Sequence, residues 1–115
     1  MVTIVREEVK VGREADHAKI EAGWPAAFGK ANSPDYYLAM VSMTGQPEAW
    51  YVIPSASNAA IGERMARAAK DPTLRAELER LSRADGEVLN STRTIQAAAR
   101  TDLTLGAYPD LAKPS

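Results

Sequence analysis

The side chain best suited to proton chemistry is His17, the only histidine of the 115-residue chain. An imidazole gains and loses its proton near neutral pH more readily than any other side chain. His17 lies on the apolar face of a helix expected over residues 13–31, where Ile20 and Trp24 follow it at helical spacing. Two interpretations stay open: a catalytic residue bordering a cavity, or a packed histidine that hydrogen-bonds a backbone carbonyl.

Two charged residues of the first expected strand are further candidates. Arg6 and Glu8 share the side of that strand opposite its mostly apolar side. Arg6 could bind an anion and Glu8 could act as a base; the alternative is that they pair with each other across a dimer or lie on an edge. Glu21 stands beside Pro25 and is expected to be a helix-surface glutamate.

Large apolar side chains could line a ligand pocket. Side chains of these kinds also serve as plain core or interface. We expect no cofactor; the one alternative is haem, whose iron needs a single axial imidazole that His17 would supply. The candidate pocket residues are Trp24, Tyr36, Met40 and Trp50.

The composition excludes several classes of function. The chain has no cysteine, so it forms neither disulfides nor thiolate metal sites. Its 14 basic and 15 acidic residues are interleaved, unlike the basic stripe of a nucleic-acid-binding protein. No apolar run approaches the roughly 20 residues that cross a bilayer, and no phosphate-binding loop or nucleophile elbow is present. We expect a cytoplasmic protein without a nucleic-acid or membrane partner.

Hydrophobic periodicity predicts strands and helices in a single domain, residues 1–115. Period-two alternation predicts a first strand that ends before Gly12. The following helix contains Pro25, which removes a backbone hydrogen bond, so we expect a break or kink near residues 21–25. The remaining predictions are a hairpin of strands at 36–44 and 48–53, helices at 61–69, 72–81 and 88–99, a short strand at 102–105 and a loose tail at 106–115.

The hairpin carries apolar side chains on both of its faces. An antiparallel sheet with one face in water would alternate apolar and polar residues. The helices of so short a chain can cover one face only. We therefore predict a homodimer in which a second copy covers the other face.

Two segments carry a resemblance to a known group of proteins. Val9–Ala15 followed by His17, and the hairpin from Ser42–Gly45 to Glu48–Trp50, resemble the dimeric α/β-barrel superfamily. That superfamily includes NIPSNAP-like proteins, stress-responsive barrel proteins and antibiotic-biosynthesis-monooxygenase-like proteins. The resemblance implies an α+β, ferredoxin-like split βαβ fold with an antiparallel sheet, paired with a second copy into a barrel.

The resemblance also implies a small-molecule pocket between the sheet and the helices or inside the barrel. We expect the protein to bind a small apolar or aromatic molecule in a cleft between the first helix and the sheet. Oxygenase-type activity without a cofactor is the associated chemistry. A structural or interaction domain with a filled barrel is one alternative and a haem-binding barrel the other.

Overall fold

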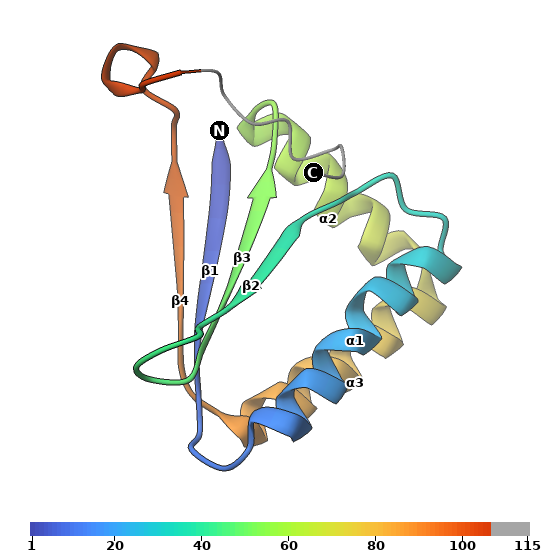
Figure 1. Cartoon of the computed structure of the whole chain (residues 1–115). Coiled ribbons are helices and arrows are strands. Elements are labelled where there is room, and N and C mark those ends of the chain that lie inside the picture. The colour runs from blue at the N-terminus through green and yellow to red at the C-terminus, as the bar shows by residue number, and fades with distance from the viewer. Residues whose placement is uncertain (107–115) are drawn as a thin grey trace.

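In the described residues, 1–106, a four-stranded antiparallel sheet and three helices make up the fold (Figure 1). The computed structural model describes residues 1–106, so the loose tail expected from residue 106 lies, beyond its first residue, outside the described part. The strand order β2-β3-β1-β4 is that of the split βαβ ferredoxin-like plan, which confirms the predicted fold class. In chain order the elements are β1 (Val2–Val9), α1 (Glu14–Lys30), β2 (Leu38–Val41), β3 (Glu48–Pro54), α2 (Asn58–Lys70), α3 (Pro72–Val88), β4 (Leu89–Ala97) and the 3-10 turn η1 (Thr101–Leu103).

Polar side chains fix the starts of α2 and α3. The Ser57 hydroxyl accepts a hydrogen bond from the Ala60 amide at 3.1 Å. The Asp71 carboxylate accepts from the amides of Thr73 and Leu74, both at 3.1 Å, and Pro72 occupies the first turn of α3. These caps satisfy amides that have no partner inside the helix. None of the helices in residues 1–106 is long and apolar enough to cross a membrane.

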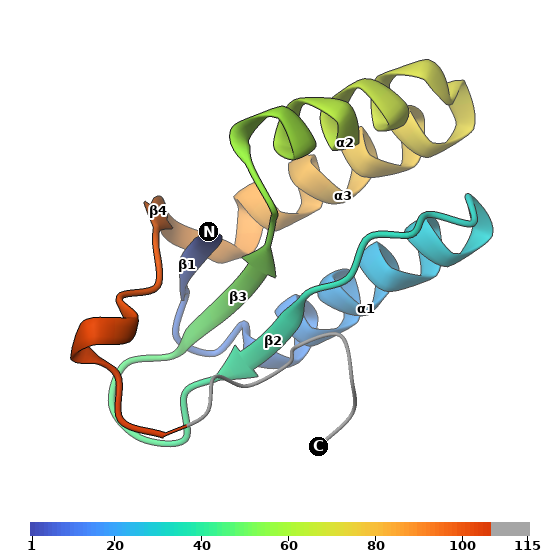
Figure 2. The same cartoon turned by 90° about the horizontal axis from the view of Figure 1, so that it is seen from above.

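All three helices lie on the same side of the sheet (Figure 2). On that side Glu7, Val9 and Ala49 are buried. Since opposite residues of an antiparallel pair point to the same face, the next positions along each strand face away from the helices. The uncovered face carries the exposed side chains of Leu38, Met40, Trp50 and Ile95.

α1 and α3 pack closely enough to explain why α1 survives its proline. Ala27, Leu74 and Leu81 form the buried core of the helix layer. A Cβ atom on Gly23 would lie 2.7 Å from the Leu81 Cδ2 atom, so glycine permits this close approach. α1 runs unbroken from Glu14 to Lys30 through Pro25, so a break near residues 21–25 is wrong, while a kink there stays a prediction. Packing against α3 holds the helix together where local propensity alone would end it.

The C-terminal part of the described chain also differs from the prediction. Residues 88–99 were expected to be helical, because Val88, Thr92 and Ile95 fall at helical spacing. The structure instead places β4 at Leu89–Ala97, hydrogen-bonded to β1, and the expected strand at 102–105 begins as the η1 turn. Pairing with the free edge of β1 satisfies backbone groups that a separate helix would leave exposed. The strand expected at 36–44 is shortened to β2.

Candidate functional site

Four ionisable side chains from three elements meet between the sheet and the helices. They are Glu7 of β1, His17 and Glu21 of α1, and Asp85 of α3, and we call them the acid–histidine cluster. Glu7, His17 and Asp85 are 8%, 4% and 7% exposed, and the Glu21 side chain is 15% exposed. Three carboxyl groups beside one imidazole are an unusual content for a protein interior, since buried charges require compensation.

The local structure places each member of the acid–histidine cluster. Glu7 belongs to the side of β1 that faces the helices, opposite Ala49 of β3. His17 and Glu21 stand one turn apart on α1 and therefore share a face. Asp85 follows the buried Leu81 by one turn of α3. Strand parity and helix period thus direct all four toward the same interior point.

His17 faces two carboxylates with one ring nitrogen. Its Nε2 atom lies 2.9 Å from Glu7 Oε1 and 3.3 Å from Glu21 Oε1. The Trp24 indole donates to Asp85 Oδ2 at 3.2 Å. Glu21 Oε1 and Asp85 Oδ1 are buried and complete no hydrogen bond with any side chain or backbone group in residues 1–106.

These contacts shift the proton affinities of the acid–histidine cluster. Interaction with Glu21, and then with Glu7, raises the pKa of His17 to about 9. Burial, together with the nearby Glu21, raises the pKa of Asp85 to about 8. Burial also opposes ionisation of Glu21, but interactions with His17, Asp85 and Tyr51 outweigh it and lower the pKa of Glu21. At neutral pH the imidazole of His17 is therefore cationic. Asp85 and Glu21 share one proton, which Asp85 holds.

We expect the free energy of unfolding to fall as pH rises from 6.5 to 9 in a buffer free of divalent cations. Folded His17 keeps its proton up to a pKa of about 9, whereas the unfolded side chain loses it near 6.5. The stability from this proton is complete below pH 6.5 and is lost through pH 9, which amounts to about 3 kcal/mol.

The other groups around the ring fit the same profile. Asp85 acts in the same direction, because its pKa is also raised by folding. Glu21 has a lowered pKa and so affects only the acid side, and Tyr51 of β3 has a raised pKa and stays neutral. Urea unfolding at several pH values measures the slope, and a profile that is flat from pH 6.5 to 9 would contradict it.

A shallow cleft of about 400 Å³, open to solvent, reaches Glu7 and Asp85 of the acid–histidine cluster from the β4 side. Its wall includes Glu7 and Asp85 together with the Trp24 ring. The rest of the lining is Ser82, Gly86, Leu89, Asn90, Ser91 and Thr92. His17 does not line this cavity but lies behind Glu7, to which it is hydrogen-bonded. We call this open cleft the inner cavity.

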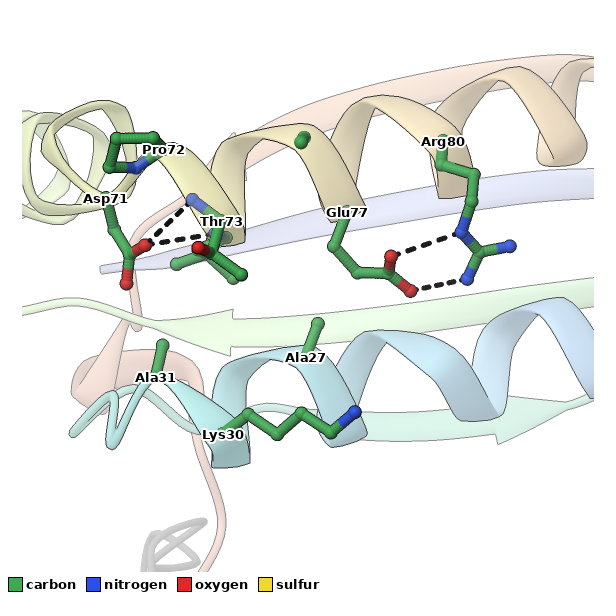
Figure 3. Close-up of a pocket in the computed structure, with 10 residues that line it drawn as sticks. Ala27, Lys30, Ala31, Asp71, Pro72, Thr73, Glu77 and Arg80 are labelled. Atoms are coloured by element: carbon green, nitrogen blue, oxygen red, sulfur yellow. Dashed lines mark hydrogen bonds and ion pairs between the residues drawn. The ribbon is translucent and has the colours of Figure 1, made fainter.

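A larger groove of about 880 Å³ lies elsewhere, between the end of α1 and the start of α3 (Figure 3). Lys30, Asp71 and the Glu77–Arg80 ion pair line it. Asp71 is already engaged in capping α3 and Arg80 in pairing with Glu77. The inner cavity is therefore the better candidate for chemistry, although it is the smaller of the two.

The structure separates the residues predicted from the sequence into two groups. His17 and Trp24 belong to the helix layer near the inner cavity. Tyr36 precedes β2 and is exposed. The others lie on the uncovered face of the sheet, where Arg6 forms an ion pair with Glu48 and sits 5.4 Å from the Trp50 ring centroid, and Glu8 accepts a hydrogen bond from Ser91. Met40 is opposite Trp50 on that face.

The structure does not suit the haem alternative. A haem iron needs an imidazole nitrogen that faces an open pocket. The Nε2 atom of His17 faces Glu7 and Glu21 instead, and the ring is 4% exposed. His17 is also not the backbone-bonded histidine of the other interpretation, because its ring partner is a carboxylate.

Sequence reasoning missed Glu7 and Asp85 and placed Glu21 on the helix surface. Glu21 is largely buried in the acid–histidine cluster, so that expectation was wrong. The available signal was an acidic residue at an apolar position: Glu7 between Val5 and Val9 on one side of the strand, and Asp85 in step with Leu81. A buried carboxylate needs a partner, and such positions identify where one is required.

Comparisons with known proteins bear on the fold. No protein-family model matches the chain, and no curated protein matches it. Among solved structures, an uncharacterized NIPSNAP domain protein from Burkholderia xenovorans is similar with a TM-score of 0.67 and 12% identity, over 88% of this chain and 96% of that one. A NIPSNAP family protein from Agrobacterium tumefaciens gives a TM-score of 0.62 and 18% identity, over 90% and 87%.

A third neighbour is an enzyme. SnoaB, a cofactor-independent oxygenase from Streptomyces nogalater, is similar with a TM-score of 0.55 and 14% identity, over 87% of this chain and 95% of that one. The resemblance found in the sequence is thus confirmed for the fold. Identities this low carry the fold alone, because one fold supports many functions.

Proposed function

We propose that the protein binds a small apolar or aromatic molecule in the inner cavity. The observation that carries this proposal is the meeting of the cavity with the acid–histidine cluster: Glu7 and Asp85 belong to both. A volume of about 400 Å³ suits a small ligand. Trp24 and Leu89 offer apolar surface to the body of such a molecule, and the two acids face its polar group.

Oxygenase-type chemistry on the bound molecule is the activity that we propose with it. SnoaB, which shares the fold, is a cofactor-independent oxygenase. In this arrangement Glu7 and Asp85 touch the ligand, and His17 acts as a positioning residue that holds Glu7 through the 2.9 Å hydrogen bond.

Filling the inner cavity tests the ligand proposal. Gly86 lines the cavity, and a Cβ atom added there meets no atom within 4 Å, so Gly86→Phe has room to leave the backbone and should place its ring over the cavity. Gly62→Phe is the matched control: this glycine of α2 is equally unobstructed and lies outside the cavity. Native mass spectrometry of the purified proteins should show a small molecule on wild type and Gly62→Phe that Gly86→Phe has lost.

A second readout covers a ligand that escapes purification. Binding of small aromatic fragments, followed by Trp24 fluorescence in a Trp50→Phe background, should weaken about tenfold or more in Gly86→Phe, about 1.4 kcal/mol. Equal binding by the two glycine variants would refute the inner cavity as the site. Absence of any bound molecule or fragment would instead favour a structural domain.

We also propose that a second copy of the chain covers the uncovered face of the sheet. Leu38, Met40, Trp50 and Ile95 expose 37% to 49% of their surface there. The same face holds charges of both signs, including the Arg6–Glu48 pair, so two copies related by a two-fold axis can match charge with charge. Burial of such a face stabilises by about 25 cal/mol for each Å² of apolar surface.

A further inference from the structure

We infer that the acid–histidine cluster binds one divalent transition-metal ion. This goes beyond the proposed function, since a ligand can occupy the inner cavity with or without a cation beside it. No sequence motif assigns a metal to this chain, and the names of the three neighbours given above mention none. The inference comes from how the four side chains are arranged.

One N–H group of His17 cannot satisfy the carboxylate oxygens of both Glu7 and Glu21. His17 Nε2 carries at most one hydrogen, yet it faces Glu7 Oε1 at 2.9 Å and Glu21 Oε1 at 3.3 Å. Only the contact with Glu7 has hydrogen-bond geometry. A cation at the centre of the cluster would contact both carboxylates and the ring nitrogen at once.

The second step concerns Asp85. Asp85 is 7% exposed, and its Oδ1 atom accepts no hydrogen bond from any N–H or hydroxyl group in the described part of the chain. The other oxygen, Oδ2, is held by the Trp24 indole, which fixes the orientation of the carboxylate. Only a proton shared with Glu21 or a bound cation can satisfy such a buried oxygen, and a cation would take the place of that proton. Glu21 Oε1 is unsatisfied in the same way.

The third step is size. One potential ligand atom from each of the four side chains lies within 4.8 Å of every other. Metal–ligand bonds of about 2.0 to 2.2 Å place ligand atoms about 3.4 Å apart in a tetrahedral site and about 4.2 Å apart across an octahedral one. The widest separation in the cluster therefore needs to shrink by about half an ångström for an octahedral ion and by up to about 1.4 Å for a tetrahedral ion, changes that side-chain rotations can supply.

The donor set decides the class of ion. An imidazole nitrogen with carboxylate oxygens suits Mn²⁺, Fe²⁺, Co²⁺ or Zn²⁺. Mg²⁺ prefers an all-oxygen shell that keeps several waters, which a buried site with a histidine does not provide. The inner cavity borders the cluster through Glu7 and Asp85, so it offers the ion a route in and a free position toward a bound molecule.

Calorimetric titration of the EDTA-treated protein tests this inference without any ligand. We expect one Zn²⁺ or Mn²⁺ per chain with a micromolar or tighter Kd, and much weaker binding of Mg²⁺. Asp85→Asn and Glu21→Gln should each weaken Zn²⁺ binding about tenfold or more, because even supporting partners of metal ligands contribute that much. Glu79→Gln, an exposed change on the same helix as Asp85, should leave the affinity unchanged.

Co²⁺ supplies a second readout that reports the histidine itself. Its visible absorption should show a nitrogen–oxygen environment in wild type, and the ring nitrogen signals of His17 should shift on addition of Zn²⁺. Asn has the shape of the protonated Asp85 side chain and Gln that of Glu21, so Asp85→Asn and Glu21→Gln are expected to fold, which circular dichroism checks.

Three results would overturn the inference: no binding of Zn²⁺ or Mn²⁺ to wild type, equal binding to the Asp85→Asn and Glu79→Gln variants, or equal affinity for Mg²⁺ and Zn²⁺. The cluster would then hold protons alone. Fragment binding in the inner cavity, measured in EDTA, would remain an independent test of the proposed function. Loss of fragment binding with metal binding intact would refute the proposed function and leave the cation site in place.

Discussion

Replacing His17 by Ala should lower the free energy of unfolding by about 3 to 5 kcal/mol, measured in EDTA at pH 7. The imidazole is the only cationic partner of Glu7 and Glu21 within hydrogen-bonding range in the described residues. Without it, buried carboxylates must either remain ionised without compensation or take up protons at neutral pH. Both outcomes cost free energy, and the missing ring also leaves a void.

A double variant separates the electrostatic cause from the void. Adding Glu21→Gln to His17→Ala removes one of the uncompensated acids and should recover part of the lost stability, whereas the void remains. Glu14→Ala, an exposed change in the first turn of the same helix, should have little effect. A loss below about 1 kcal/mol for His17→Ala, or a double variant less stable than the single one, would contradict this explanation.

Met40→Asp should convert the proposed dimer into a monomer and raise its dissociation constant by about 100-fold or more, which corresponds to about 2.7 kcal/mol. Met40 stands opposite Trp50 on the uncovered face, at 44% exposure in the single chain. A second copy would bury that position, and an unpaired carboxylate there would lose its hydration. Sedimentation equilibrium over a range of protein concentrations measures the change.

The neighbouring residue supplies the control. Val41 belongs to the same strand but points to the opposite face, and it is 71% exposed. Val41→Asp should therefore leave the dimer intact and change the stability of the chain little. A wild-type protein that stays monomeric at micromolar concentration would refute the dimer, as would equal dissociation of the two variants.

The fold could be predicted because its main signals are local. The period-two pattern of β1 and the hairpin of β2 and β3 are visible in the sequence, and the Asp71-Pro72 pair marks the start of α3. The short chain indicated that the helices would cover one face only, and the apolar character of both hairpin faces still predicts a second copy over the other. These signals need no knowledge of distant contacts.

The errors arose where distant contacts decide the structure. Val88, Thr92 and Ile95 fit a helical stripe as well as they fit a strand, and only the open edge of β1 selects β4. Pro25 disfavours a helix locally, but the packing of Ala27 and Gly23 against α3 keeps α1 continuous. Neither the edge nor the packing can be seen in a single segment.

The site was only partly predictable for a similar reason. His17 stands out by residue type alone. Glu7 and Asp85 are ordinary acidic residues whose significance depends on lying on apolar faces of different elements. The sequence shows each acidic residue on an apolar face separately. That β1, α1 and α3 bring these residues to one point is seen only in the fold.

The buried position of His17 between Glu7 and Glu21 underlies the cation site, the pH dependence and the alignment of Glu7 at the inner cavity. Nuclear magnetic resonance of the ring nitrogens during a pH titration measures it most directly, in protein treated with EDTA. We predict that the pKa of His17 is near 9, because two carboxylates favour the protonated ring. A pKa at or below the ordinary value of about 6.5 would contradict the ion pairing of His17 with Glu7 and Glu21 and the pH dependence of stability derived from it.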